Sequence, residues 1–261
     1  MPYELLYSLL STPRLYSFFF IFFRVSVCLF LLPFFGSVNL PTVWKASLSL
    51  LLALFLSQVV PVQPLVVQSS VQMVLMICAE TLLGVVLALS VRIILAGFQI
   101  AGQFIGFQMG YSIVNVIDPQ SGSQSSILAQ FSYILAILIF LLINGHHLLL
   151  QAVIRSFELI PPGGFVLQAG IYAKLVKLSS IMFQVAVRIS APVMIALLLT
   201  TVALGLICKT VPQINILIVG FPLNIGIGLL IFGISMGTLV PYFSRLLKQL
   251  LPVVYGLIQS G

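Results

Sequence analysis

Apolar residues follow one another in this chain in runs too long for the helices of an ordinary soluble domain. The stretches without a charged residue include 46–79, 93–117, 119–154, 189–208 and 210–244, and the shortest of these has 20 residues. A membrane-spanning helix needs roughly 20 mainly apolar residues. Proline, glycine and polar clusters inside the longer runs mark turns between helices. The pattern predicts an all-α, multi-pass membrane protein of long, kinked helical hairpins, with five to seven helical passes.

Turn signals divide these runs into expected helices. They cover residues 15–35, 42–60, 65–117, 127–143, 144–158, 168–208 and 214–243. We expect a break or bend in the third near Gly84 or Arg92, because it is too long for one perpendicular span. We expect a kink at Pro192 and a division of the last helix at residues 220–224.

Charged residues inside the apolar patterns are the next informative feature. Arg24, Arg92 and Arg188 lie within expected helices, where an arginine at the bilayer centre costs roughly 2.5–3.5 kcal/mol. Such residues face a wet cavity, pair with partners or lie outside the lipid. Glu80 is the one charge between residues 46 and 91. It serves either in a proton relay or as the partner of one of these arginines.

Composition narrows the class of protein further. The 261 residues are 61% hydrophobic and 6% charged, with 11 basic and 4 acidic side chains. Soluble domains are about 25% charged, and disordered chains are poor in apolar residues, so both classes are excluded. Three cysteines are too few for a disulfide scaffold. The net charge of +7 reflects scarce acids rather than a basic patch, which argues against nucleic-acid binding.

No catalytic or metal-binding pattern is present in the sequence. The four acidic residues are not spaced for paired-carboxylate catalysis, and the zinc, nucleotide-binding and nucleophile-elbow motifs are missing. His146 and His147 are adjacent, so on a helix they point about 100° apart and do not readily grip one metal ion. We therefore expect a non-enzymatic protein without metal or cofactor, and a helix break with hydrogen-bonded imidazoles at residues 144–147.

Glycine recurs every four residues at Gly102, Gly106 and Gly110, and again at Gly233 and Gly237. This spacing places the glycines on one helix face and allows another backbone to approach closely. The face packs within the chain, against a neighbouring subunit or beside a pore.

The most polar stretch of the chain follows the first glycine stripe. Residues 117–126 read IDPQSGSQSS, and Asp118-Pro119 is a turn initiator. Non-helical backbone at membrane depth is tolerated only where protein buries it or water bathes it. The segment is therefore either an external loop or a re-entrant, pore-lining loop.

Three blocks of sequence in this order carry a resemblance to a known family. They are AGQFIGFQMGYSIVNVIDPQSGSQSS at 101–126, NGHHLLL at 144–150 and VPQINILIVGFPLNIGIGL at 211–229. In combination they resemble the FliR/SctT family of type III export-gate proteins. The resemblance extends over essentially the whole chain, so residues 1–261 are expected to form one export-gate subunit.

The resemblance implies a fold and an assembly. A FliP-like part is followed by a FliQ-like part, and the subunit packs with FliP and FliQ in a right-handed helical assembly, with FlhB around its closed base. It implies a structural, pore-forming role in moving unfolded flagellar proteins across the bacterial inner membrane, within the flagellar basal body. The injectisome counterpart is an alternative. A small secondary transporter using Glu80 is another, although the inverted repeats that it predicts are not found.

The resemblance also implies site residues. The loop matching residues 106–124 plugs the closed channel, with Ile113 and Val116 as plug residues. The expected gating set is Gly106, Met109, Gly110, Ile113, Val116, Asp118 and Pro119, and the expected subunit-packing set is Gly102, Gly233 and Gly237.

Overall fold

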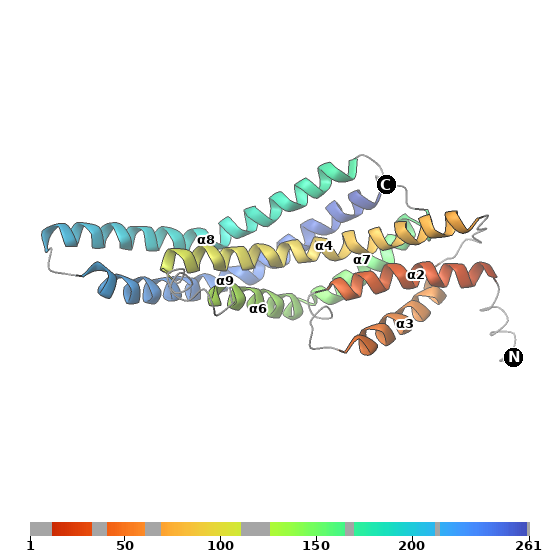
Figure 1. The fold of residues 1–261 in the computed structure, drawn as a ribbon, viewed down its shortest axis with the longest axis horizontal. Helices are drawn as coiled ribbons and strands as arrows, with labels where there is room; N and C mark the ends of the chain where they lie inside the picture. Colours follow the sequence, from red (N-terminus) through yellow and green to blue (C-terminus); the bar gives the residue numbers. More distant parts are fainter. Residues whose placement is uncertain are drawn as a thin grey trace. The chain divides into compact units, whose positions relative to one another are not determined.

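The computed structural model describes residues 12–32, 41–60, 69–110, 126–164, 170–211 and 215–259. Within these ranges the regular elements are seven α-helices and no strand (Figure 1). The helices are α2 (Thr12–Leu31), α3 (Thr42–Val59), α4 (Ser70–Met109), α6 (Ile127–Leu142), α7 (Gly145–Leu159), α8 (Gly170–Thr210) and α9 (Ile216–Gln259). The predicted all-helical class is confirmed for these residues.

Local chemistry explains where several helices end. Leu31 closes α2 two residues before Pro33, whose ring disfavours helical backbone at the preceding residue. Gly110 follows α4 with φ +91°, a left-handed conformation that glycine adopts without strain. Asn144 separates α6 from α7 with φ 56°, and asparagine is one of the few other residues that tolerates this region. The predicted helix break at residues 144–147 is thus confirmed at its first residue.

Two predicted helix breaks are absent from the described helices. Helix α4 continues without a break through Gly84 and Arg92, and it ends at Met109 rather than near residue 117. Helix α9 is undivided at residues 220–224 and extends to Gln259. Pro222 removes one amide donor, whereas a complete break within an apolar helix would leave several backbone groups without partners.

The chain forms two compact units. The first comprises residues 1–92, 144–177 and 247–261, and the second comprises residues 93–143 and 178–246. In the first unit α2 packs beside α3 (Figure 1). It also approaches α4 closely, because a Cβ on Gly84 would lie 2.7 Å from the Arg24 carbonyl oxygen.

In the second unit α4 packs against both α8 and α6. A Cβ on Gly97 would lie 2.9 Å from the Met182 carbonyl oxygen of α8. The rings of Phe98 and Phe243 approach to 5.1 Å between centroids, which joins α4 to α9. The core of this unit is therefore shared by four helices.

Four helical segments of the described chain are long and apolar enough to cross a membrane, namely Thr42–Val59, Ser70–Met109, Val176–Thr210 and Ile218–Gln249. Helices α6 and α7 together make a fifth if they are counted as one broken span. Large apolar side chains are exposed on these helices, such as Trp44 at 73% and Ile218 at 71%. Exposed apolar surface of this extent is typical of contact with lipid or partner subunits. The chain is a multi-pass membrane protein. Its described residues supply four such spans, below the predicted five to seven, and reach five only when the broken pair is counted.

Candidate gating site at the end of α4

The last turns of α4 lie in an apolar socket within the second unit. Met109 and Ile105 are fully buried there, and Phe232 of α9 is 2% exposed. The buried members of the cluster are Ile105, Met109, Leu128, Val193, Leu197 and Phe232. Each of the four helices of the unit contributes at least one side chain to this cluster, so the end of α4 is fixed from several sides.

Two glycines of the α4 stripe, Gly102 and Gly106, lie against α6 of the same chain and the residue before it. A Cβ on Gly102 would lie 2.6 Å from the Leu128 carbonyl oxygen and 2.8 Å from the Ala129 Cα. A Cβ on Gly106 would overlap the hydroxyl of Ser126, at the start of α6. Backbone atoms cannot yield as a flexible side chain does, so position 102 requires glycine, whereas Gly106 meets only side-chain atoms. Gly102 therefore packs against α6 of the same chain, and its assignment to a subunit interface stays a prediction.

Gly110 fixes the point at which the chain leaves α4. Its amide donates to the Phe107 carbonyl oxygen at 3.1 Å, which closes the final turn. A Cβ there would lie 2.5 Å from the ring of Phe221 on α9, and the positive φ also disfavours any other residue. Ser126 lies against Gly106, one turn earlier on the same helix. Gly110 and Ser126, the described residues on either side of segment 111–125, therefore both lie near the same end of α4.

The predicted gating residues divide into two groups. Gly106, Met109 and Gly110 come together at the socket, although residues 106–109 are helical rather than part of a loop. This corrects the expected start of the loop by four residues. Ile113, Val116, Asp118 and Pro119 lie outside the described residues.

The two glycines of α9 that we expect at a subunit interface have no neighbouring group beside them in the described chain. Neither Gly233 nor Gly237 would bring a Cβ within 4 Å of another group in the described chain. Their assignment to a subunit interface stays a prediction. The contrast with Gly102 shows that equal spacing in sequence leads to different partners.

A buried ion pair occupies the interior of the first unit. Arg24 and Glu80 are both fully buried, and their side chains form a two-pronged contact. The Arg24 Nε atom donates to Glu80 Oε2 at 2.6 Å, and Nη2 donates to Oε1 at 3.0 Å. This geometry is the strongest form of a charged hydrogen bond. Of the alternatives for Glu80, the structure selects pairing with Arg24.

The remaining polar groups of this pair are satisfied by α7 and the turn after it. Arg24 Nη1 donates to the Ser156 hydroxyl at 3.1 Å, and Nη2 donates to the Ile160 carbonyl oxygen at 3.3 Å. The amide of Gly163 donates to Glu80 Oε1 at 2.7 Å. Gly163 has φ +80°, so the glycine of the PPGG turn permits this approach. The sequence signalled Arg24 and Glu80 as isolated charges, but it gave no signal for Ser156.

The histidine pair lies directly after the left-handed Asn144. The rings of His146 and His147 approach to 4.2 Å between centroids. The Nδ1 atom of His146 is buried without a hydrogen-bond partner in the described structure, which contradicts the expected hydrogen bonding for that atom. No group of three metal-ligating side chains occurs among the described residues.

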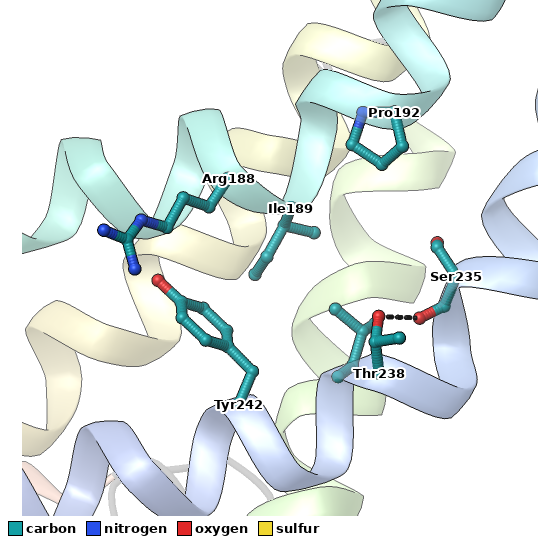
Figure 2. A pocket seen from close by; sticks show the side chains of 7 residues that line it. Arg188, Ile189, Pro192, Ser235, Thr238 and Tyr242 are labelled. Carbon is teal, nitrogen blue, oxygen red and sulfur yellow. Dashed lines mark hydrogen bonds between the residues drawn. The ribbon is translucent and has the colours of Figure 1, made fainter.

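A pocket lies between α8 and α9 in the second unit (Figure 2). Its volume is about 260 Å³, and its polar groups are hydroxyls and one guanidinium. It is lined by Arg188, Ile189, Pro192, Ser235, Thr238, Leu239 and Tyr242. The Tyr242 hydroxyl points toward the guanidinium, whose Cζ atom is 6.0 Å from the ring centroid (Figure 2).

Helical spans, a glycine-lined apolar socket and a structural ion pair define a membrane protein built for packing rather than catalysis. Comparison with known proteins identifies its family. Residues 15–250 match the bacterial export proteins, family 1, and the chain belongs to this family. Its members are export components rather than enzymes.

Curated relatives resemble the chain over much of its length. The chain is 37% identical over 229 residues to the flagellar biosynthetic protein FliR of Bacillus subtilis, covering 85% of this chain and 87% of the relative. It is 30% identical over 181 residues to the same protein of Escherichia coli, covering 69% of each. The FliR of Aquifex aeolicus is 26% identical over 242 residues, with 92% of both chains covered.

Proposed function

We propose that this chain is a structural subunit of the flagellar type III export gate in the bacterial inner membrane. In that role it helps unfolded flagellar proteins to cross the membrane and is needed for assembly of the flagellum. The names of its relatives support the flagellar system. The observation that supports a gating role best is the socket, in which Gly110 and Ser126, the residues that flank segment 111–125, lie beside the same turns of α4.

The residue types of this segment suit a movable plug. A channel for unfolded polypeptide must be wide when open and must block ions when closed. Apolar side chains such as Ile113 and Val116 close a constriction by excluding water, and they do so without strong directional bonds. Gln120, Ser123 and Gln124 keep the segment compatible with water once it is displaced. Anchored ends allow the segment to return to the same place.

Partner subunits complete the proposed gate. The chain packs with copies of FliP and FliQ in a right-handed helical assembly, its own FliP-like part preceding its FliQ-like part, and FlhB surrounds the closed base. The open faces at Gly233 and Gly237 are suited to close approach of a neighbouring helix.

The flagellar gate is favoured over the two alternatives. The relatives described above are named for flagellar biosynthesis rather than for an injectisome. A proton-coupled transporter would need an acid free to exchange protons, whereas Glu80 is held by Arg24 and by the Gly163 amide.

Replacing Ile113 and Val116 together by glycine tests the plug. The assembled gate, reconstituted in planar bilayers, is expected to conduct ions at rest, since the closed constriction loses its water-excluding side chains. The matched control is the double change Ser121→Gly and Ser123→Gly, which adds the same backbone freedom but removes no apolar group. An unchanged resting conductance in an intact complex would contradict the plug assignment.

A further inference from the structure

The pocket between α8 and α9 combines a cation with hydroxyl groups on an otherwise apolar helical hairpin. Arg188 is exposed, and the hydroxyl of Tyr242 points toward its guanidinium (Figure 2). A volume of about 260 Å³ is more than ten times what a single water molecule needs. We infer that this pocket binds the phosphate of an anionic lipid headgroup, a role beyond the proposed gating function.

Two neighbouring side chains of the pocket, Arg188 and Tyr242, supply hydrogen-bond donors. The Arg188 guanidinium has five N–H donors and no acceptor, and it matches phosphate geometry with paired hydrogen bonds. The phenol of Tyr242 beside it adds an O–H group. A phosphate oxygen placed between these two side chains receives hydrogen bonds from both.

The remaining polar groups of the pocket are acceptors. The hydroxyls of Ser235 and Thr238 donate at 2.7 Å to the carbonyl oxygens of Phe232 and Ser235, so their lone pairs are what they offer to a ligand. Pro192 lacks an amide hydrogen, so the Arg188 carbonyl four residues earlier has no helical donor. A headgroup that has hydroxyl donors next to its phosphate complements this arrangement. Phosphatidylglycerol has both groups, and phosphatidylcholine has neither the net charge nor the donors.

Charge balance also favours an anionic ligand. After Glu158 the sequence has no acidic residue, whereas the same part of the chain has six basic ones. Neither α8 nor α9 therefore supplies a carboxylate for Arg188. The negative charge that neutralises it comes from outside this hairpin.

The position of Arg188 along α8 matches headgroup depth. The 20 residues 189–208 contain no charge, and Lys209 follows them. At 1.5 Å per residue, Arg188 and Lys209 are about 31 Å apart, close to the hydrocarbon thickness of roughly 30 Å. Tyrosine is enriched at the membrane–water boundary, which agrees with Tyr242 in the same pocket.

Lipid binding to the full-length chain tests this inference. The chain is purified in detergent, titrated with phosphatidylglycerol or with phosphatidylcholine, and analysed by native mass spectrometry for retained lipid. We expect phosphatidylglycerol to be retained preferentially, and Arg188→Gln to weaken this binding about tenfold. The matched control is Arg92→Gln, which removes one exposed arginine elsewhere and should leave the preference intact. Tyr242→Phe keeps the ring, and a smaller, several-fold loss is expected from it.

Two further arms separate the sources of the anion. Inorganic phosphate is added in excess, and retention of the lipid supports a site for the whole headgroup, whereas displacement of the lipid shows a free-phosphate site and overturns the inference. Equal retention by Arg188→Gln and Arg92→Gln also overturns it. If Arg188→Gln instead abolishes co-purification with partner subunits while lipid retention is unchanged, the pocket holds a protein carboxylate and the lipid assignment is wrong.

Discussion

The two compact units of this chain differ in whether their apolar interior also holds charges. The first unit buries Arg24 and Glu80 completely, with hydrogen bonds to α7 and to the PPGG turn. The socket of the second unit is formed by apolar side chains, among them Met109 and Phe232. The first interior adds directional charged bonds to its apolar packing, whereas the socket of the second depends on contact area and shape.

This difference has consequences for what each interior can do. A buried ion pair requires every partner in place, because an unpaired charge is strongly unfavourable in an apolar environment. Apolar contacts have no such requirement and tolerate changes that conserve volume. An apolar socket therefore suits the anchor of the proposed moving segment, and the ion pair suits a region whose helices keep one register.

The largest expected effect is the loss of one member of the ion pair. Glu80→Gln leaves the Arg24 charge buried without its countercharge and should lower the free energy of unfolding by about 3–5 kcal/mol. Thermal unfolding in detergent, followed by circular dichroism, measures this loss. The double change Arg24→Met with Glu80→Leu removes both charges and should be far milder. If the double variant is as unstable as Glu80→Gln, the charges are not what distinguishes the first interior.

A truncation in the apolar socket is expected to come second. Met109→Ala removes a fully buried side chain and should cost about 2–5 kcal/mol through lost contacts and a cavity. Met109→Leu conserves most of the volume and should cost less than about 1.5 kcal/mol. Thermal unfolding in detergent, as for the ion pair, measures the stability of both variants. Equal costs would show that the socket depends on a specific methionine contact rather than on filled space.

The smallest expected change in unfolding free energy comes from replacing either of two glycines of the second unit. Gly102→Ala should destabilise the chain by about 1–3 kcal/mol, because the added methyl group meets backbone atoms of α6. Gly233→Ala meets open space and should stabilise α9 by up to about 1 kcal/mol. Unfolding of the isolated chain gives both values. Co-purification with partner subunits then reports the open face, and a normal yield of complex from Gly233→Ala would argue against a subunit contact there.

Much of this protein follows from the sequence because the relevant signals are local. Charge-free runs of 20 residues or more predicted the membrane class and most helix positions, since spanning length and backbone hydrogen bonding depend on neighbouring residues. The exceptions also have local causes. Proline at 222 resembled a helix end, yet α9 continues through it because flanking turns keep their own hydrogen bonds.

Long-range choices needed the tertiary structure. The sequence offered Arg24, Arg92 and Arg188 as partners of Glu80, and only the packing of α2 against α4 selected Arg24. Equal glycine spacing could not show that Gly102 faces α6 while Gly233 faces open space. Helix periodicity fixes which residues share a face, but the surface opposite that face belongs to residues distant in the chain, and folding alone brings the two together.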